Sequence, residues 1–249
     1  NTLKSGLPNA IRVAKEYLQP NGYRLKGVRI DSGDMAYLSK KIRERLDAAD
    51  MKDCQIVASN SLDEYLIESL LSQGAQIDSL GVGENLVTSK SSPVFGGVYK
   101  LSAIIKDGEM VPKIKVSENI EKVTNPGMKN LYRIYDKETK KALGDIMTLH
   151  DEVLDPTQDL TIYHQMNYWK NKTIKGGSYE LRDLLVPIFV EGKLVYDCPS
   201  LNQIRSYSEK ELDRLWDEIK RFTYPQTYYV DLSRKLLDLK MKMLEEVPK

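Results

Sequence analysis

Polar side chains and glycines follow three short apolar runs in the first part of this 249-residue chain. The first run ends in RIDSGD at 29–34, the second in ASNS at 58–61, and the third in LGVGEN at 80–85. Carboxylates, hydroxyls and amides bind the hydroxyls of a sugar, and glycine-flanked backbone amides bind phosphate. These residue types therefore suit a small phosphorylated ligand. The candidate residues are Arg29, Asp31, Ser32, Gly33, Asp34, Ser59, Asn60, Asp63, Gly81, Gly83, Glu84 and Asn85.

The three runs alternate with amphipathic segments, so we expect parallel strands joined by helices. Residues 35–50, for example, place Leu38, Ile42, Leu46 and Ala49 at helical spacing. Repeated βα units of this kind form an open sheet or part of a (β/α) barrel, and in both the ligand gathers at the carboxyl ends of the strands. The three polar ends are therefore expected to converge on one mouth.

Some of these residues also have a purely structural interpretation. Asp34 stands where it would cap the helix that follows, and a Gly-Val-Gly after a βα strand is more often a simple tight turn. The sequence SLDE at 61–64 has the pattern of a capping box between Ser61 and Glu64. We expect Gly74 to end the helix that this box begins.

The third strand end is the candidate phosphate site. The glycines allow a close approach of the backbone, and the amides of Gly83, Glu84 and Asn85 would open a helix whose dipole favours an anion. Glu84 fits this interpretation if its amide points toward the phosphate while its side chain leans away. Both the phosphate site and the simple turn stay open at this point.

From about residue 97 the pattern becomes β-like, and the tail is expected to be helical. We divide the chain into an α/β part at 1–105, a β-rich domain at 106–205 and a C-terminal helical segment at 206–249. The β-like stretches are 96–104, 111–117, 130–136 and 185–197, with turn signals at DGE, NPG and EGK. The expected tail helices are 208–222, with Leu212, Leu215, Trp216 and Ile219 on one face, and 232–247.

Charge and composition exclude several classes of partner. A net charge of +1 supplies no basic field for nucleic acid or an anionic membrane, and the apolar runs fall well short of the roughly 20 residues that span a bilayer. Cys54 and Cys198 lie far apart without metal-ligand spacing, which favours a reducing cytoplasm over a disulfide framework or a zinc site. His150 and His164 have no nucleophile or second histidine at a useful spacing, so we interpret them as structural or surface residues.

The three strand ends resemble those of nicotinate phosphoribosyltransferase when they are taken with three later segments. These segments are GGVYKLSAI at 96–104, KVTNPGMKNLYRIYD at 122–136 and YPQTYYVDLSRKL at 224–236. Several motifs in one order are far more specific than a single glycine turn. The resemblance implies the C-terminal half of a type II phosphoribosyltransferase: a partial (β/α) barrel in residues 1–105 that binds the phosphoribosyl group, a β-rich section and C-terminal helices. Such enzymes are homodimers with sites near the subunit interface.

The resemblance also implies an activity in NAD biosynthesis and salvage. Such enzymes convert nicotinate and Mg²⁺-bound phosphoribosyl pyrophosphate to nicotinate mononucleotide and pyrophosphate. They are ATP-coupled ligases, or glycosyltransferases, whose transient phosphohistidine makes them phosphoproteins. The Mg²⁺ would be held by substrate phosphates and water, so no protein metal site is expected.

The resemblance assigns roles to the residues that match its motifs. It implies that Arg29 lies at the pyridine or ribose and Asp31 at the ribose hydroxyls, both as catalytic residues. Ser59 and Asn60 match a strand end where the related nicotinamide enzymes have Gly-Asp, so hydrogen bonding can persist there but the charge cannot. The loop whose amides hold the 5′-phosphate matches Gly81, Gly83 and Glu84.

One expected group has no match in this chain. The phosphorylated histidine of the family lies upstream of RIDSGD, and neither His150 nor His164 occupies a matching position. We therefore expect the chain alone to be inactive unless it is joined to an N-terminal half.

Three rival functions fit parts of the same pattern. A nicotinamide phosphoribosyltransferase is disfavoured by Asn60, GVGEN and GGVYKL, and an aldolase-like barrel by the lack of a lysine at these strand ends. A non-enzymatic subunit or remnant stays open because of the missing histidine.

Overall fold

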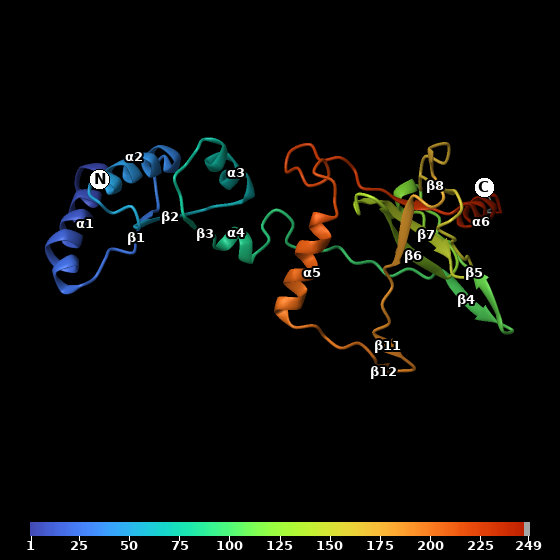
Figure 1. Ribbon diagram of the computed structural model, residues 1–249. Coiled ribbons are helices and arrows are strands. Elements are labelled where there is room, and N and C mark those ends of the chain that lie inside the picture. Colours follow the sequence, from blue (N-terminus) through green and yellow to red (C-terminus); the bar gives the residue numbers. More distant parts are fainter. Residues whose placement is uncertain (247–249) are drawn as a thin grey trace. The chain divides into compact units, whose positions relative to one another are not determined.

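The computed structural model describes residues 1–246, and the chain forms two compact units, Asn1–Gly97 and Val98–Lys249 (Figure 1). Among the described residues no helix is both long enough and apolar enough to cross a membrane. The three-part division expected from the sequence stays a prediction.

The first unit is a helical N-terminal stretch followed by three βα units. Its three strands form one parallel sheet in the order β1-β2-β3, with Ile30 beside Ala58 and Ala58 beside Leu80. The elements are η1 Thr2–Gly6, α1 Leu7–Val13, η2 Ala14–Leu18, η3 Gln19–Asn21, β1 Gly27–Ile30, α2 Met35–Ala48, β2 Gln55–Ser59, α3 Glu64–Ser72, β3 Ser79–Gly81 and α4 Glu84–Val87.

The apolar residues that recur at helical spacing in 35–50 lie on the buried face of a helix, as the sequence predicts. Ile42 and Leu46 of α2 are fully buried against Ile56 of β2, and Leu38 is partly buried beside them. The carboxylate of Asp34 accepts a hydrogen bond of 2.9 Å from the Tyr37 amide, which makes it the N-cap of α2. This core holds the strands of the first sheet in place.

The capping box expected at 61–64 is wrong, because α3 begins at Glu64 with Asp63 as its N-cap. The Asp63 carboxylate accepts from the Leu66 amide at 2.8 Å, while the Ser61 hydroxyl donates to the Asn60 side chain instead. The chain passes through left-handed backbone at Ser61, which moves the helix start away from that residue. Gly74, at φ +69°, follows the last turn of α3 as predicted.

The second unit is built on a six-stranded sheet in the order β10-β6-β7-β13-β8-β9. Its elements are β4 Ala103–Lys106, β5 Glu109–Pro112, η4 Ile120–Lys122, β6 Lys129–Asp136, β7 Ala142–Leu149, β8 Leu160–Tyr163, β9 Asn171–Ile174, β10 Tyr179–Asp183, β11 Phe189–Val190, β12 Lys193–Leu194, α5 Leu201–Asp213, β13 Val230–Leu232 and α6 Arg234–Glu245. The expected turns at DGE and EGK connect β4 to β5 and β11 to β12. The expected strand at 96–104 begins only at Ala103.

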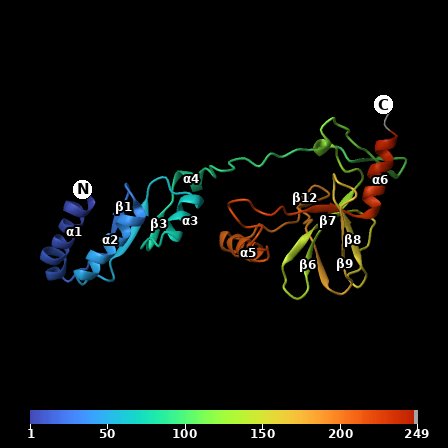
Figure 2. The same ribbon diagram turned by 90° about the horizontal axis from the view of Figure 1, so that it is seen from above.

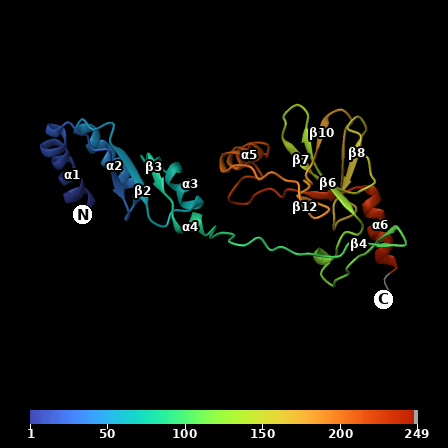
Figure 3. The ribbon, with the colours of Figure 1, turned by 90° about the horizontal axis from the view of Figure 1, so that it is seen from below.

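Helices α5 and α6 lie apart from each other along this sheet, as Figure 2 and Figure 3 show from above and below. Leu236 and Leu237 of α6 pack with Leu232 of β13, with Met147 and Tyr163 beside them. The helix expected at 232–247 is therefore present as Arg234–Glu245, and its last expected residue, Val247, lies outside the described residues. This packing also ties the tail of the chain into the sheet.

The helix expected at 208–222 is wrong in its position. Helix α5 begins at Leu201, after Ser200 and Gln203 form a capping box, and it ends at Asp213. The ammonium group of Lys141 donates to the backbone carbonyls of Asp213 and Leu215, which fixes the helix end there. Residues 214–229 then form an irregular strap rather than more helix.

Candidate functional site

The carboxyl ends of the three parallel strands meet at one edge of the first sheet. The register pairs Ile30 with Ala58 and Ser59 with Gly81, so the polar residues that follow each strand begin at neighbouring positions. This is the arrangement that the sequence predicts for a ligand site.

Three side chains from the first two strand ends form a closed hydrogen-bonded ring. The Arg29 guanidinium donates through Nε to Ser59 Oγ at 2.7 Å and through Nη2 to Asp31 Oδ2 at 3.0 Å. Ser59 Oγ in turn donates to Asp31 Oδ1 at 3.1 Å. The ring orients a carboxylate, a hydroxyl and a guanidinium together, and we call it the strand-edge cluster.

Asn60 and Asn85 join the remaining strand ends to this cluster. The side-chain amide of Asn60 donates to the Asp31 carbonyl at 3.0 Å. The side-chain amide of Asn85 donates to the carbonyls of Ser61 at 3.1 Å and Leu62 at 3.0 Å. The third strand end is therefore fastened to the second, which is fastened to the first.

The two glycines at the third strand end have different roles. A Cβ at Gly81 would lie 3.2 Å from the Cβ of Ser59, so the small residue is needed for close packing of β2 and β3. A Cβ at Gly83 would meet nothing within 4 Å, and Gly83 is the N-cap of α4. Since α4 has four residues, its dipole is weak, and an anion there would be bound mainly by the individual amides.

The backbone at the second strand end is strained. Asn60 has φ +89° and Ser61 φ +50°, two consecutive non-glycine residues in the left-handed region. Such conformations cost energy and concentrate at binding sites, where the surrounding structure holds them. Asparagine tolerates this region better than most residues, which suits Asn60 to this position.

The strand-edge cluster is open to solvent. The side chains of Arg29 and Asp31 are 63% and 56% exposed, so their ion pair contributes at most about 1 kcal/mol to stability. Their arrangement is therefore available to a ligand rather than required by the fold. Asp34, by contrast, is occupied as a helix cap, which agrees with its structural interpretation.

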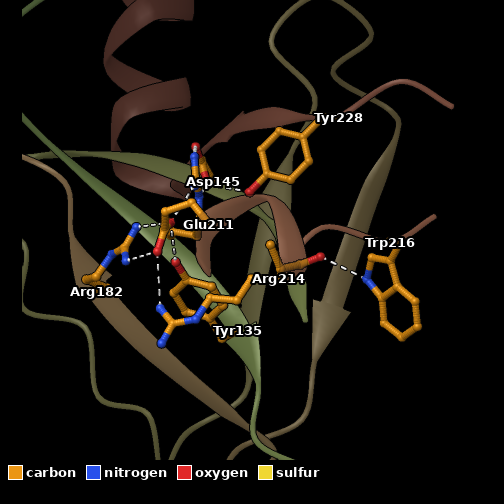
Figure 4. Close-up of polar contacts among 9 residues, drawn as sticks. Tyr135, Asp145, Arg182, Glu211, Arg214, Trp216 and Tyr228 are labelled. Carbon is orange, nitrogen blue, oxygen red and sulfur yellow. Dashed lines mark hydrogen bonds and ion pairs between the residues drawn. The ribbon is translucent and has the colours of Figure 1, made fainter. Parts of the chain in front are cut away.

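A second cluster of charged groups, in the second unit, was not foreseen from the sequence. Asp145 accepts two hydrogen bonds from Arg133, at 2.9 and 3.1 Å, and one from the Tyr228 hydroxyl at 2.6 Å. Glu211 accepts two from Arg182, at 2.7 and 2.6 Å (Figure 4). We call these residues the buried ion cluster.

The buried ion cluster satisfies its own charges. The hydrogen bonds from Arg182 lower the pKa of the Glu211 carboxyl, and burial raises the pKa of the Tyr228 hydroxyl. The guanidinium groups of Arg182 and Arg214 also lie over the Tyr135 ring. Groups that are fully paired in this way favour a structural role. The partners stand up to 83 positions apart, and no local motif joins them.

The two histidines occupy positions that agree with their structural interpretation. The side chain of His150 is exposed, and its backbone amide donates to the Met128 carbonyl. His164 is half-buried, and its Nδ1 accepts from the amides of Met166 and Asn167. Both cysteines, Cys54 and Cys198, are free.

Comparison with known proteins shows what the chain is similar to. Residues 128–240 match the family described as the nicotinate phosphoribosyltransferase C-terminal domain. The chain is 44% identical over 249 residues to the nicotinate phosphoribosyltransferase of Bacillus subtilis (strain 168), covering 99% of this chain and 50% of that protein. The resemblance is confirmed: this chain is similar to part of the nicotinate phosphoribosyltransferases.

Solved structures extend the match to the fold. The crystal structure of human nicotinic acid phosphoribosyltransferase superposes with a TM-score of 0.69 at 28% identity, covering 96% of this chain and 44% of that one. The α/β fold class with a partial barrel, a β-rich section and C-terminal helices is thereby confirmed. Nicotinate-nucleotide pyrophosphorylase from Pyrococcus furiosus shares the fold at a TM-score of 0.50 and 19% identity. The chain spans about half the length of the nicotinate phosphoribosyltransferases it matches.

Proposed function

We propose that this chain is the C-terminal half of an enzyme that transfers a phosphoribosyl group to nicotinate. The products are nicotinate mononucleotide and pyrophosphate, and the reaction serves NAD biosynthesis or salvage. The observation that carries the proposal is the ring of Arg29, Asp31 and Ser59, exposed at the same sheet edge as the glycine-flanked amides of the third strand end. The 44% identity to a nicotinate phosphoribosyltransferase supports it.

The chemistry needs positioning and charge more than a protein nucleophile. Loss of pyrophosphate leaves positive charge on the anomeric carbon, which a preorganised carboxylate stabilises. Asp31 supplies that carboxylate, and its ring of hydrogen bonds holds it in one orientation. Arg29 supplies a cation for the carboxylate of nicotinate or for the ribose region.

The other candidate residues bind the rest of the sugar phosphate. Ser59 and Asn60 offer a hydroxyl and an amide to the ribose hydroxyls. The backbone amides of Gly83 and Glu84 bind the 5′-phosphate, and Gly81 lets β3 lie close enough to β2 for all of these groups to share one edge.

Mg²⁺ enters this proposal bound to phosphoribosyl pyrophosphate. Among residues 1–246 no group of three or more His, Cys, Asp or Glu side chains could hold a metal ion. In the proposal, substrate phosphates and water coordinate the Mg²⁺. ATP is the proposed co-substrate, coupled through a phosphohistidine of an N-terminal half. A homodimer in the cytoplasm completes the proposal.

Competition between two pyridines tests the reaction. The intact protein is incubated with phosphoribosyl pyrophosphate, Mg²⁺, ATP and equal amounts of nicotinate and nicotinamide, and the nucleotides are separated by chromatography. We expect nicotinate mononucleotide and pyrophosphate in equal amounts. Nicotinamide mononucleotide as the main product would favour the nicotinamide enzyme, and the absence of either nucleotide would favour a non-enzymatic subunit.

A further inference from the structure

A cavity of about 850 Å³ is lined only by residues of the second unit and by none of the candidate residues for the proposed reaction. Leu232 of β13 packs under α6, so the alternation of the strand turns its neighbour Asp231 toward the opposite face of the sheet, where the cavity lies. Strands β7, β8 and β9 and the strap at 214–229 supply its other walls. The volume is in the range of small-molecule sites.

A buried carboxylate without a partner lines this cavity. Asp231 is 9% exposed, and within residues 1–246 its carboxylate makes no hydrogen bond or ion pair. Burial raises the pKa of the Asp231 carboxyl, and the positive charge of Lys172 only partly opposes this. The carboxylate oxygens of Asp231 are not among the fully enclosed atoms of residues 1–246 that lack a partner, so they are open to the cavity. They can accept a hydrogen bond from an N–H group of a ligand there.

His164 supplies the complementary group. Its Nδ1 accepts hydrogen bonds of 3.1 Å from the amides of Met166 and Asn167, so the neutral ring carries its hydrogen on Nε2. The ring also packs edge-on against Tyr229 at 5.6 Å between centroids, which restricts its orientation. Nε2–H is therefore the free donor on a residue that lines the cavity.

The remaining walls carry aromatic rings together with two lysines and Glu218. Trp216 and Tyr228 already use their polar atoms, in bonds to the Ala142 carbonyl and to Asp145, so they offer apolar ring surface. Trp169 lines the same cavity and is 75% exposed. Lys170 and Lys172 also line it, and their charge disfavours a ligand that is wholly cationic.

These features specify a flat ring with an N–H donor beside an acceptor, and an anionic group at a distance from that edge. Adenine meets the first requirement, because its 6-amino group donates and its neighbouring N1 accepts. A 5′-phosphate meets the second. We propose that this cavity binds an adenine nucleotide. Asp231 and His164 form hydrogen bonds with the base, Trp169 stacks on it, and the two lysines bind the phosphate.

The site stands apart from the proposed function, which involves residues of the first unit. Binding of AMP to the intact protein, measured by isothermal titration calorimetry, tests it. All titrations use an Asp31→Ala background, so that AMP bound at the strand-edge cluster does not contribute. We expect saturable binding that weakens by at least about 10-fold in Asp231→Asn, as for the loss of a charge-assisted hydrogen bond.

Two matched comparisons make the result specific. Trp169→Ala should weaken AMP binding about 5-fold or more through lost stacking, whereas Tyr224→Ala should not. Tyr224 is 92% exposed, belongs to the same unit and does not line the cavity. Both side chains are exposed, so neither change threatens the fold.

A second ligand isolates the contact with the base. Purine riboside 5′-monophosphate lacks the exocyclic amine, so it should bind about 10-fold more weakly than AMP, and Asp231→Asn should leave its affinity unchanged. The proposal is overturned if AMP does not saturate the Asp31→Ala protein, if Asp231→Asn and Trp169→Ala bind AMP normally, or if the purine analogue binds as tightly as AMP. Loss of transferase activity alone would not affect any of these results.

Discussion

Each unit of the chain contains an arginine hydrogen-bonded to a carboxylate and linked to a hydroxyl, but the two clusters differ in their contact with water. In the strand-edge cluster, Arg29 and Asp31 are 63% and 56% exposed. In the buried ion cluster, Arg133 and Asp145 are 21% and 6% exposed. The same chemical groups are therefore available to a ligand in one unit and are part of the core in the other.

The difference shows that composition alone does not identify a site. A buried carboxylate must be paired, and removing its partner leaves an uncompensated charge, so the second cluster is tied to stability. An exposed pair contributes little to stability because water screens it. Its preorganised geometry at a sheet edge is then best explained by binding. Mutations can separate these two roles.

The largest expected effect is on the buried ion cluster. Asp145→Ala should lower the free energy of unfolding by about 3–5 kcal/mol, because Arg133 and Tyr228 lose their shared acceptor. Urea unfolding measures the loss, and hydrogen exchange in β6 and β7 locates it. The control is Glu180→Ala, which removes an exposed ion pair to Lys140 from the same sheet and should leave the free energy of unfolding nearly unchanged. Equal losses for the two variants would contradict the comparison.

The strand-edge cluster should show the opposite pattern. Asp31→Ala in the intact enzyme should lower turnover by at least ~100-fold while changing stability by no more than about 1 kcal/mol. Steady-state kinetics and urea unfolding measure the two effects. Asp34→Ala is the control from the same loop, since loss of this helix cap should cost about 1 kcal/mol with little change in turnover. Near-normal turnover of Asp31→Ala would remove Asp31 from the site.

The location of the strand-edge cluster could be predicted because it depends on local sequence patterns. Each strand is a short apolar run, each polar end follows directly, and parallel pairing brings the ends together. The periodicity of α2 and the cap at Asp34 are equally local. These features lie within single βα units, where neighbours in sequence are neighbours in space.

The sequence could not predict features that depend on distant partners. Helix α5 ends at Asp213, where Lys141, more than 70 positions away, donates to the carbonyls of Asp213 and Leu215. Glu211 meets Arg133 and Arg182 only after the six-stranded sheet has formed. The sequence alone likewise does not distinguish Asp231 from other polar residues, because its location depends on the pairing of β13 with β7 and β8.

The pH dependence of stability offers an intermediate test of the buried ion cluster. Arg182 lowers the pKa of the Glu211 carboxyl in the folded protein. The ionised carboxylate therefore stabilises the fold fully above the ordinary glutamate pKa of 4.5, and this stabilisation is lost as the pH falls through the lower pKa of the folded protein. Glu211→Gln should cost about 2 kcal/mol at pH 7. Urea unfolding should show that the difference in free energy of unfolding between Glu211→Gln and the unaltered protein becomes smaller below pH 4.5. Glu209→Gln, an exposed change on the same helix, is the control. A gap that is constant with pH would rule out this source of stability.

Two serines of the first unit give the smallest and most discriminating test. Ser59 is in the strand-edge cluster, and Ser59→Ala should change stability by about 0.5 kcal/mol or less, because water replaces its bonds. Turnover should fall roughly 5- to 10-fold, since Arg29 and Asp31 lose the hydroxyl that orients them both. Ser39 is fully buried, donates to the Ala36 carbonyl and accepts from the Gln76 amide. Ser39→Ala should therefore cost about 1–2 kcal/mol and leave turnover unchanged. If both serines affected stability and turnover in the same proportion, exposure would not be what separates a binding cluster from a structural one in this chain.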